Sequence, residues 1–245
     1  MSGPKLDGAD WRARAVFLGP AQQPGGAEQP VDSPVAFRDV TSKNVSAIRP
    51  RVAVPVGVSP GDGLVLFVTV NAAGATMSEP AGVTGWQRIG DLESGTMRTY
   101  VYQRVATGDE DGLDVMFTLA RRVKVTMQLL VYAGTATQAP VVPVAAGKDA
   151  GTATHTTPRV DVTVPGSWVL SYWADKSSST TGWTAPQQET ARAVSLGSLS
   201  GRVTSLAADS GGPVAVGRYG GLTATADAES SRGTMWSLVL APALS

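Results

Sequence analysis

Short runs in which apolar and polar residues alternate fill the chain from about residue 37 onward. Runs such as GLVLFVTV, TMRTYVYQRV, SWVLSYWA and TMWSLVLA are rich in β-branched and aromatic residues, which favour strands. Clusters of Gly, Pro, Asp and Ser, such as SPGDG and DSGGP, separate the runs, as turns do. The pattern predicts an all-β protein with a jelly-roll-like β-sandwich fold and almost no helix.

One strand phrase occurs twice, as VTMQLLVYA at 125–133 and as GTMWSLVLA at 233–241. Other phrases of the first half recur in the same order in the second half. The matching pairs are 54–71 with 162–175, Gly85-Trp86 with Gly182-Trp183, and SGTMRTYVYQRVATGDEDGLDV with SGRVTSLAADSGGPV. Matches that keep their order while the loops change length are typical of an old duplication.

The duplication predicts two pseudo-repeated halves, at about 45–138 and 153–242, within one domain that spans 37–245. The segment 139–158 is long enough to link the halves either as two tandem sandwiches or as one larger unit. We favour one sandwich-like unit whose halves are related by a pseudo-twofold axis.

Residues 1–36 differ from the rest, because five prolines and a Gly-Gly pair interrupt any regular element. We predict an extended N-terminal arm that docks on a partner, against the alternatives of a floppy leader or a segment packed on its own domain. The predicted docking residues are Trp11, Arg12, Arg14, Val16, Phe17 and Leu18. The apolar run at 15–18 is too short for a signal peptide, and no run reaches the length of a membrane span.

Charge and cysteine content narrow the classes of function. The chain of 245 residues has 20 Lys plus Arg and 20 Asp plus Glu, so its net charge attracts neither nucleic acid nor an anionic membrane. It has no cysteine, which removes disulfides, thiolate metal sites and cysteine nucleophiles. We expect no cofactor and no bound metal.

Two strings resemble hydrolase motifs. GVSPG at 57–61 has the spacing of a nucleophile elbow, but that elbow needs a strand before it and a helix after it. ADSGGPV at 208–214 resembles the sequence around the nucleophile of trypsin-like proteases, which would make Ser210 the nucleophile. The single histidine, His155, lies in a Thr-rich segment unlike that family's. We predict turns at both strings and no catalytic residue.

The turn GDEDGLD places Asp109, Glu110, Asp111 and Asp114 close together. Clustered carboxylates suit Ca²⁺, but the spacing and distal Glu of an EF-hand are missing. We therefore interpret this segment as a solvated acidic turn.

Aromatic residues are the remaining candidates for a binding site. Strand alternation in SWVLSYWAD places Trp168 and Tyr172 on one face and Trp173 on the other. Trp173, Asp175 and Trp183 could grip a sugar ring by stacking and hydrogen bonds, or they could pack in the core.

Four longer phrases carry a resemblance to a known family: FRDVTSKNVSAIRPRVAVPVGVSPGDGLVLFVTVN, GTMRTYVYQRVATGDEDG, LSYWADKSSSTTGWTAP and GRVTSLAADSG. They resemble a β-sandwich module of actinobacterial secreted proteins, which also occurs in minor tail and other structural proteins of actinobacteriophages. The likeness covers about residues 36–242 and consists of strand and turn phrases. It implies a non-catalytic structural or adhesive role and supplies no catalytic residue.

From the resemblance and the arm we expect a structural protein of a tailed-phage virion, either a capsid-surface decoration or a tail-associated protein. It would be assembled in the host cytoplasm without a signal peptide, as a homo-oligomer bound to capsid or tail proteins. The alternative is a carbohydrate- or cell-wall-binding module whose partner is a host cell-surface glycan.

Overall fold

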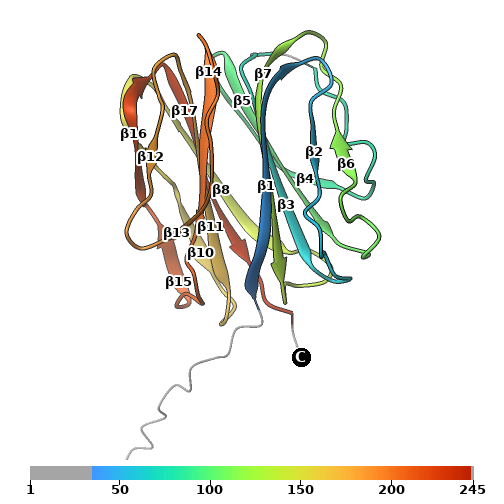
Figure 1. The fold of residues 1–245 in the computed structure, drawn as a ribbon. Helices are drawn as coiled ribbons and strands as arrows, with labels where there is room; N and C mark the ends of the chain where they lie inside the picture. Colours follow the sequence, from blue (N-terminus) through green and yellow to red (C-terminus); the bar gives the residue numbers. More distant parts are fainter. Residues whose placement is uncertain (1–34, 75, 244–245) are drawn as a thin grey trace, which may run out of the picture. The chain divides into compact units, whose positions relative to one another are not determined.

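The computed structural model describes residues 35–74 and 76–243, and all regular elements within these ranges are β-strands (Figure 1). Seventeen strands, β1 to β17, follow one another along the described residues. The all-β prediction is therefore confirmed.

Two five-stranded antiparallel sheets form the centre of the fold. The first sheet has the order β1-β7-β3-β5-β4, with bounds Ala36–Ala47, Val123–Ala133, Gly63–Val70, Met97–Val105 and Gln87–Ser94. The second has the order β13-β14-β11-β17-β8, with bounds Thr190–Ser195, Arg202–Asp209, Trp168–Ser177, Arg232–Leu240 and Val141–Asp149. Each sheet is thus built from one half of the chain, coloured blue to green and yellow to red in Figure 1.

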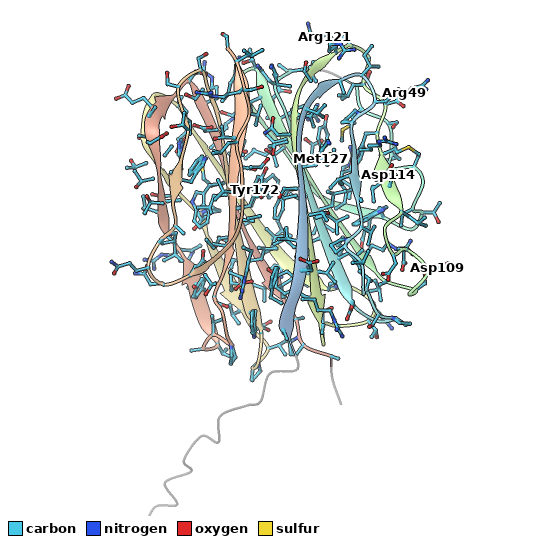
Figure 2. All side chains as sticks on the ribbon, viewed as in Figure 1. Arg49, Asp109, Asp114, Arg121, Met127 and Tyr172 are labelled. Carbon is cyan, nitrogen blue, oxygen red and sulfur yellow. The ribbon has the colours of Figure 1, made fainter. Side chains whose placement is uncertain are left out.

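The two sheets pack face to face across one apolar core, as in a β-sandwich. Phe67 and Tyr132 of the first sheet share this core with Leu170, Tyr172 and Leu238 of the second. The rings of Phe67 and Tyr172 stack with centroids 4.0 Å apart and planes 1° from parallel, and Figure 2 shows Tyr172 between the sheets. The two halves therefore share one core.

The two sheets have the same topology: when the strands of each sheet are ranked by their position in the chain, they occupy the same spatial order. The strands β1, β3, β4, β5 and β7 take the same relative places as β8, β11, β13, β14 and β17. Irregular pairing also recurs, because β4 shifts register between Arg88 and Gly90 and β13 between Ala191 and Ala193. This common topology is the arrangement that two pseudo-repeated halves require.

Smaller sheets cover the outer face of each large sheet. Their strands are β2 with β6 over the first sheet, and β9, β12 and β16 together with β10 and β15 over the second. Their bounds are Arg51–Ala53, Asp114–Met116, Thr152–Thr156, Trp183–Thr184, Thr223–Ser230, Arg159–Val162 and Gly217–Gly220. Because both faces of each large sheet are covered, β3 is buried along its whole length and β11 over nearly all of its length.

Hydroxyl groups connect the two sheets within the core. Thr99 contacts Thr234 at 2.7 Å and Thr69 at 2.8 Å, and Thr69 also contacts the hydroxyl of Tyr172 at 2.8 Å. At the pseudo-equivalent place, Thr126 and Ser205 lie 3.2 Å apart. Paired hydroxyls avoid the cost of burying polar groups and favour one alignment of the two sheets.

The segment 139–158, predicted to be a linker, is mostly strand. It contains β8, which pairs with β17 at the edge of the second sheet, and β9, which pairs with β16 in the covering layer. None of the apolar runs quoted above corresponds to the edge strands β1, β4 and β13. Edge strands face water on one side and carry polar residues, so their alternation is weak.

Gly90 allows the indole of Trp236 to lie directly against β4. A Cβ at position 90 would come within 2.4 Å of the Trp236 ring, and this ring is only 2% exposed. We expect Gly90→Ala to lower the free energy of unfolding by about 1–3 kcal/mol, because the ring has no free space to move into. Urea unfolding measures the change. Gly212→Ala, which meets open space, is the control and is expected to stay close to the wild type.

Candidate functional site

The predicted docking residues Trp11, Arg12, Arg14, Val16, Phe17 and Leu18 lie outside the described residues. Docking of the arm stays a prediction. Val35 is 2% exposed and belongs to the core between the two sheets. The sandwich therefore begins no later than residue 35.

Of the two alternatives for Trp173 and Asp175, the structure contradicts a surface sugar site and bears out packing in the core, because both residues are 0% exposed. Strand alternation correctly separated Trp173 from Trp168 and Tyr172. The face that carries Trp173, however, is covered by the sheet of β9, β16 and β12. A buried indole offers no surface for a sugar to stack on.

Asp175 and Trp183 lie close together because both form hydrogen bonds with Thr204 inside the protein. Thr204 accepts a hydrogen bond from the indole nitrogen of Trp183 at 2.8 Å and donates one to Asp175. Burial raises the pKa of Asp175, and hydrogen bonds from Thr180 and Thr204 partly offset this effect. Trp183 keeps partial exposure, but it packs against the cluster around Trp173. This network holds the covering sheet to the large sheet.

His155 lies in the same layer and is 0% exposed. Its Nδ1 lies 2.9 Å from both carboxylate oxygens of Asp149, and its ring centroid is 5.3 Å from that of Trp183. Gly233 makes room for this pair, since a Cβ there would lie 2.2 Å from Asp149. His155 is therefore part of the packing between strands.

The carboxylates of the acidic turn bind different partners and do not converge on one point. Asp111 accepts hydrogen bonds from the backbone amides of Gly57 and Val58, each at 2.9 Å, and Asp114 pairs with Arg51 at 2.9 Å. Figure 2 shows Asp109 and Asp114 at the outer side of the first half. Within the described residues, no group of three or more His, Cys, Asp or Glu side chains is arranged to hold a metal ion.

Glu110 differs from its neighbours in the turn because it is 2% exposed and pairs with Arg104. Burial opposes its ionisation, but hydrogen bonds from the Thr107 amide, the Arg104 guanidinium and the Thr107 hydroxyl outweigh burial and lower its pKa to about 2. We expect this stabilisation to be fully present above pH 4.5 and to be lost as the pH falls towards 2.

Glu110→Gln should therefore lower the free energy of unfolding at pH 7 by about 2 kcal/mol. The difference from the wild type should shrink as the pH falls from 4.5 to 2. Urea unfolding at several pH values measures it. A difference that stays constant with pH would contradict the assignment.

The two hydrolase-like strings form turns. Ser59 donates its backbone amide to Asp62 at 2.8 Å. The Ser210 hydroxyl donates to the carbonyl of Gly212 at 2.7 Å, and the single histidine pairs with Asp149. No hydrogen bond joins Ser210 to His155 in the part of the chain that the structure describes.

A buried acidic network that the sequence did not reveal lies beside β13. Asp209 is 0% exposed, makes two hydrogen bonds with Arg192 at 2.7 and 2.8 Å, and accepts a third from Tyr132 at 2.8 Å. Glu189 is 9% exposed and accepts a hydrogen bond from Ser171 at 2.7 Å. Burial raises the pKa of Glu189 to about 8, and the nearby charge of Asp209 adds to the effect.

An exposed threonine face covers the outer sheet of β9, β16 and β12. Cross-strand pairing aligns Thr184, Thr225 and Thr154 in one row, and Thr223 with Thr156 in the next. All five side chains are exposed, whereas the alternate residues Trp183, Ala224, Ala226 and His155 face inward. The spacing TATHT at 152–156 and TAT at 223–225 is the sequence signal for this face.

A hollow of about 450 Å³ adjoins the threonine face. Its nine lining residues are uncharged: Thr184, Ala185, Pro186, Gln187, Gln188, Gly221, Leu222, Thr223 and Thr225. Together, the hollow and the threonine face form a neutral surface rich in groups that both donate and accept hydrogen bonds. This surface, rather than Trp173 and Asp175, is the candidate functional site.

Comparison of the chain with protein-family models, with curated protein sequences and with solved structures found no match. No helix long and apolar enough to cross a membrane occurs in the described residues.

Proposed function

We propose that the protein is a non-enzymatic structural component of a tailed-phage virion, either on the capsid surface or associated with the tail. Residues 1–34 would hold it to capsid or tail proteins, and the sandwich would face outward. The observation that carries this proposal is the way the chain enters the fold. The first described strand, β1, is an edge strand of the first sheet, so a preceding segment can leave the sandwich without disturbing its pairing.

The interior of the sandwich supports a display role. Hydroxyl pairs and the ion pair of Arg192 with Asp209 add polar contacts to the large apolar core shared by the halves. Satisfied polar contacts in a core favour one rigid arrangement. A rigid unit can carry load or present a surface at a distance from its anchor.

Density-gradient fractionation of a lysate that contains the assembled particles tests this function. We expect mass spectrometry to find the full chain in the particle fractions and a variant lacking residues 2–34 only in the soluble fractions. The truncated chain should unfold at the same temperature as the full chain, because it keeps β1 and the buried Val35 of the core. Normal incorporation of the truncated chain, or recovery of the full chain only in soluble fractions, would overturn the proposal.

A second function, carbohydrate or cell-wall binding, is favoured by the neutral hollow beside the threonine face. Groups that both donate and accept hydrogen bonds complement sugar hydroxyls, which do the same. The two functions are compatible, because a protein on the surface of a virion can also bind glycans on the host cell.

A further inference from the structure

We propose that the threonine face and the adjoining hollow bind a neutral glycan chain, which rests on the carbohydrate-binding function above. The threonine face is defined by Thr154, Thr156, Thr184, Thr223 and Thr225, and the hollow by its nine lining residues. The glycan would cross the strands β12, β16 and β9 and place one sugar in the hollow.

The threonine face repeats in two dimensions. Neighbouring strands lie about 4.8 Å apart, and outward residues along one strand recur about every 6.8 Å. The row of Thr184, Thr225 and Thr154 therefore presents one hydroxyl on each of three neighbouring strands. A polymer of similar units can contact such a row repeatedly, which adds affinity without a deep pocket.

The side chains of this face lose little freedom on binding. Threonine is β-branched, so its χ1 angle is already restricted on a paired strand. Thr156 and Thr223 further fix each other through a contact of 2.8 Å between their hydroxyls. An ordered surface pays a smaller entropic cost when a ligand binds.

The hollow supplies the contacts that threonine alone lacks. Gln187 and Gln188 are exposed and add amides that donate and accept hydrogen bonds, while the partly exposed Leu222 adds apolar contact for the CH groups of a sugar ring. The hollow of about 450 Å³ is open to solvent and has room for a sugar ring. Its lining therefore suits both surfaces of a pyranose.

The charges point to a neutral ligand. None of the five threonines or nine lining residues is charged; the flanking charges are Arg159, whose side chain lies close to Gly221, and Asp227 and Glu229 at the next outward positions of β16. A phosphorylated or uronate polymer would find no cluster of cations to pair with. Neutral hexose polymers are the class that fits.

The threonine face is not a general feature of the repeated fold, because the covering layer of the first half lacks it. In the covering layer of the first half, β2 and β6 carry Arg51 and Asp114, which form an ion pair at 2.9 Å instead of a row of hydroxyls. In the second half, by contrast, threonine occupies the outward positions 154, 156, 184, 223 and 225, and the acidic Asp227 and Glu229 take the next outward positions of β16. The face is therefore a feature of the second half alone.

The test measures retention of the full chain on beads of three neutral polysaccharides, cellulose, galactan and mannan, with polygalacturonate as an anionic control. We expect retention on at least one neutral polymer and none on polygalacturonate. The double variant Thr154→Val/Thr225→Val keeps the shape and the methyl groups but removes two hydroxyls of one row. It should bind at least tenfold more weakly while unfolding at the wild-type temperature.

The matched control is Thr118→Val, an exposed threonine of the first half, which should bind as the wild type does. Equal binding by all three proteins would overturn the site while leaving the carbohydrate-binding function intact. Binding to whole host cell walls without retention on any neutral polymer would overturn the assignment of a neutral glycan, but it would leave the carbohydrate-binding function intact.

Failure to bind either cell walls or polysaccharides would overturn both the site and the carbohydrate-binding function. Regular rows of threonine could instead match the lattice of ice. Enrichment of the wild type, but not the double variant, in growing ice without glycan retention would therefore assign the face to ice and overturn this proposal.

Discussion

Replacing Glu189 with glutamine is expected to raise the free energy of unfolding at pH 9 by about 4 kcal/mol and to leave it nearly unchanged at pH 4. Burial in the folded protein raises the pKa of Glu189 from 4.5 to about 8. Between these two values the folded state holds a proton that the unfolded state has lost. The wild type therefore loses stability as the pH rises from 4.5 to 8, by about 1.4 kcal/mol per pH unit.

Glutamine keeps the shape of the protonated carboxyl and can still accept the hydrogen bond from Ser171. Because it does not ionise, Glu189→Gln should remove this loss of stability. Urea unfolding of both proteins from pH 4 to pH 9 measures the effect, and the exposed Glu79→Gln serves as the control. If the wild type and Glu189→Gln gave parallel profiles, Glu189 would not be the group that titrates near pH 8.

Removing Arg192 is expected to destabilise the protein by about 3–5 kcal/mol, because it leaves the buried carboxylate of Asp209 without its cation. Arg192 makes two hydrogen bonds to Asp209, and Asp209 is 0% exposed. The guanidinium also lies 4.4 Å from the ring centroid of Phe37 in β1, so it connects the edges of the two sheets. Arg192→Met is the test, read by urea unfolding at pH 7.

A double variant separates the buried charge from the loss of packing. Arg192→Met/Asp209→Leu removes both charges, so it should be clearly more stable than Arg192→Met alone. The exposed pair of Arg218 and Asp161, 3.5 Å apart, provides the control, and Arg218→Met should change stability by less than about 1 kcal/mol. An Arg192→Met effect as small as this control would show that the pair contributes little.

The sequence alone predicted the central strands well, because their residues are apolar and bounded by turn signals. The strands β3 and β5 lie within predicted runs, and β11 and β17 overlap theirs over most of their length. The doubled phrase at 125–133 and 233–241 corresponds to β7 and β17, which take equivalent places in the two sheets. A repeat leaves a signal in the sequence wherever the same core position selects the same kind of residue.

The candidate site could not be predicted in the same way. Alternation shows that Trp168 and Trp173 lie on opposite faces of β11, but it cannot show whether a face is covered. The cover over Trp173 comes from β9 and β16, which are almost 70 residues apart in the chain and pair through Thr154 with Thr225. The threonine face exists only because this pairing aligns residues that are distant in sequence.

The sequence by itself determined the fold class and the repeated strand order, since both follow from local patterns of apolar residues and turns. Only the tertiary structure decided which polar residues became internal. Asp209 and Glu189 follow no apolar pattern, yet both are buried, Asp209 against Tyr132 and Glu189 against Ser171. Burial depends on neighbours brought together across the sheets, and those neighbours give Glu189 its raised pKa and leave the threonine face in water.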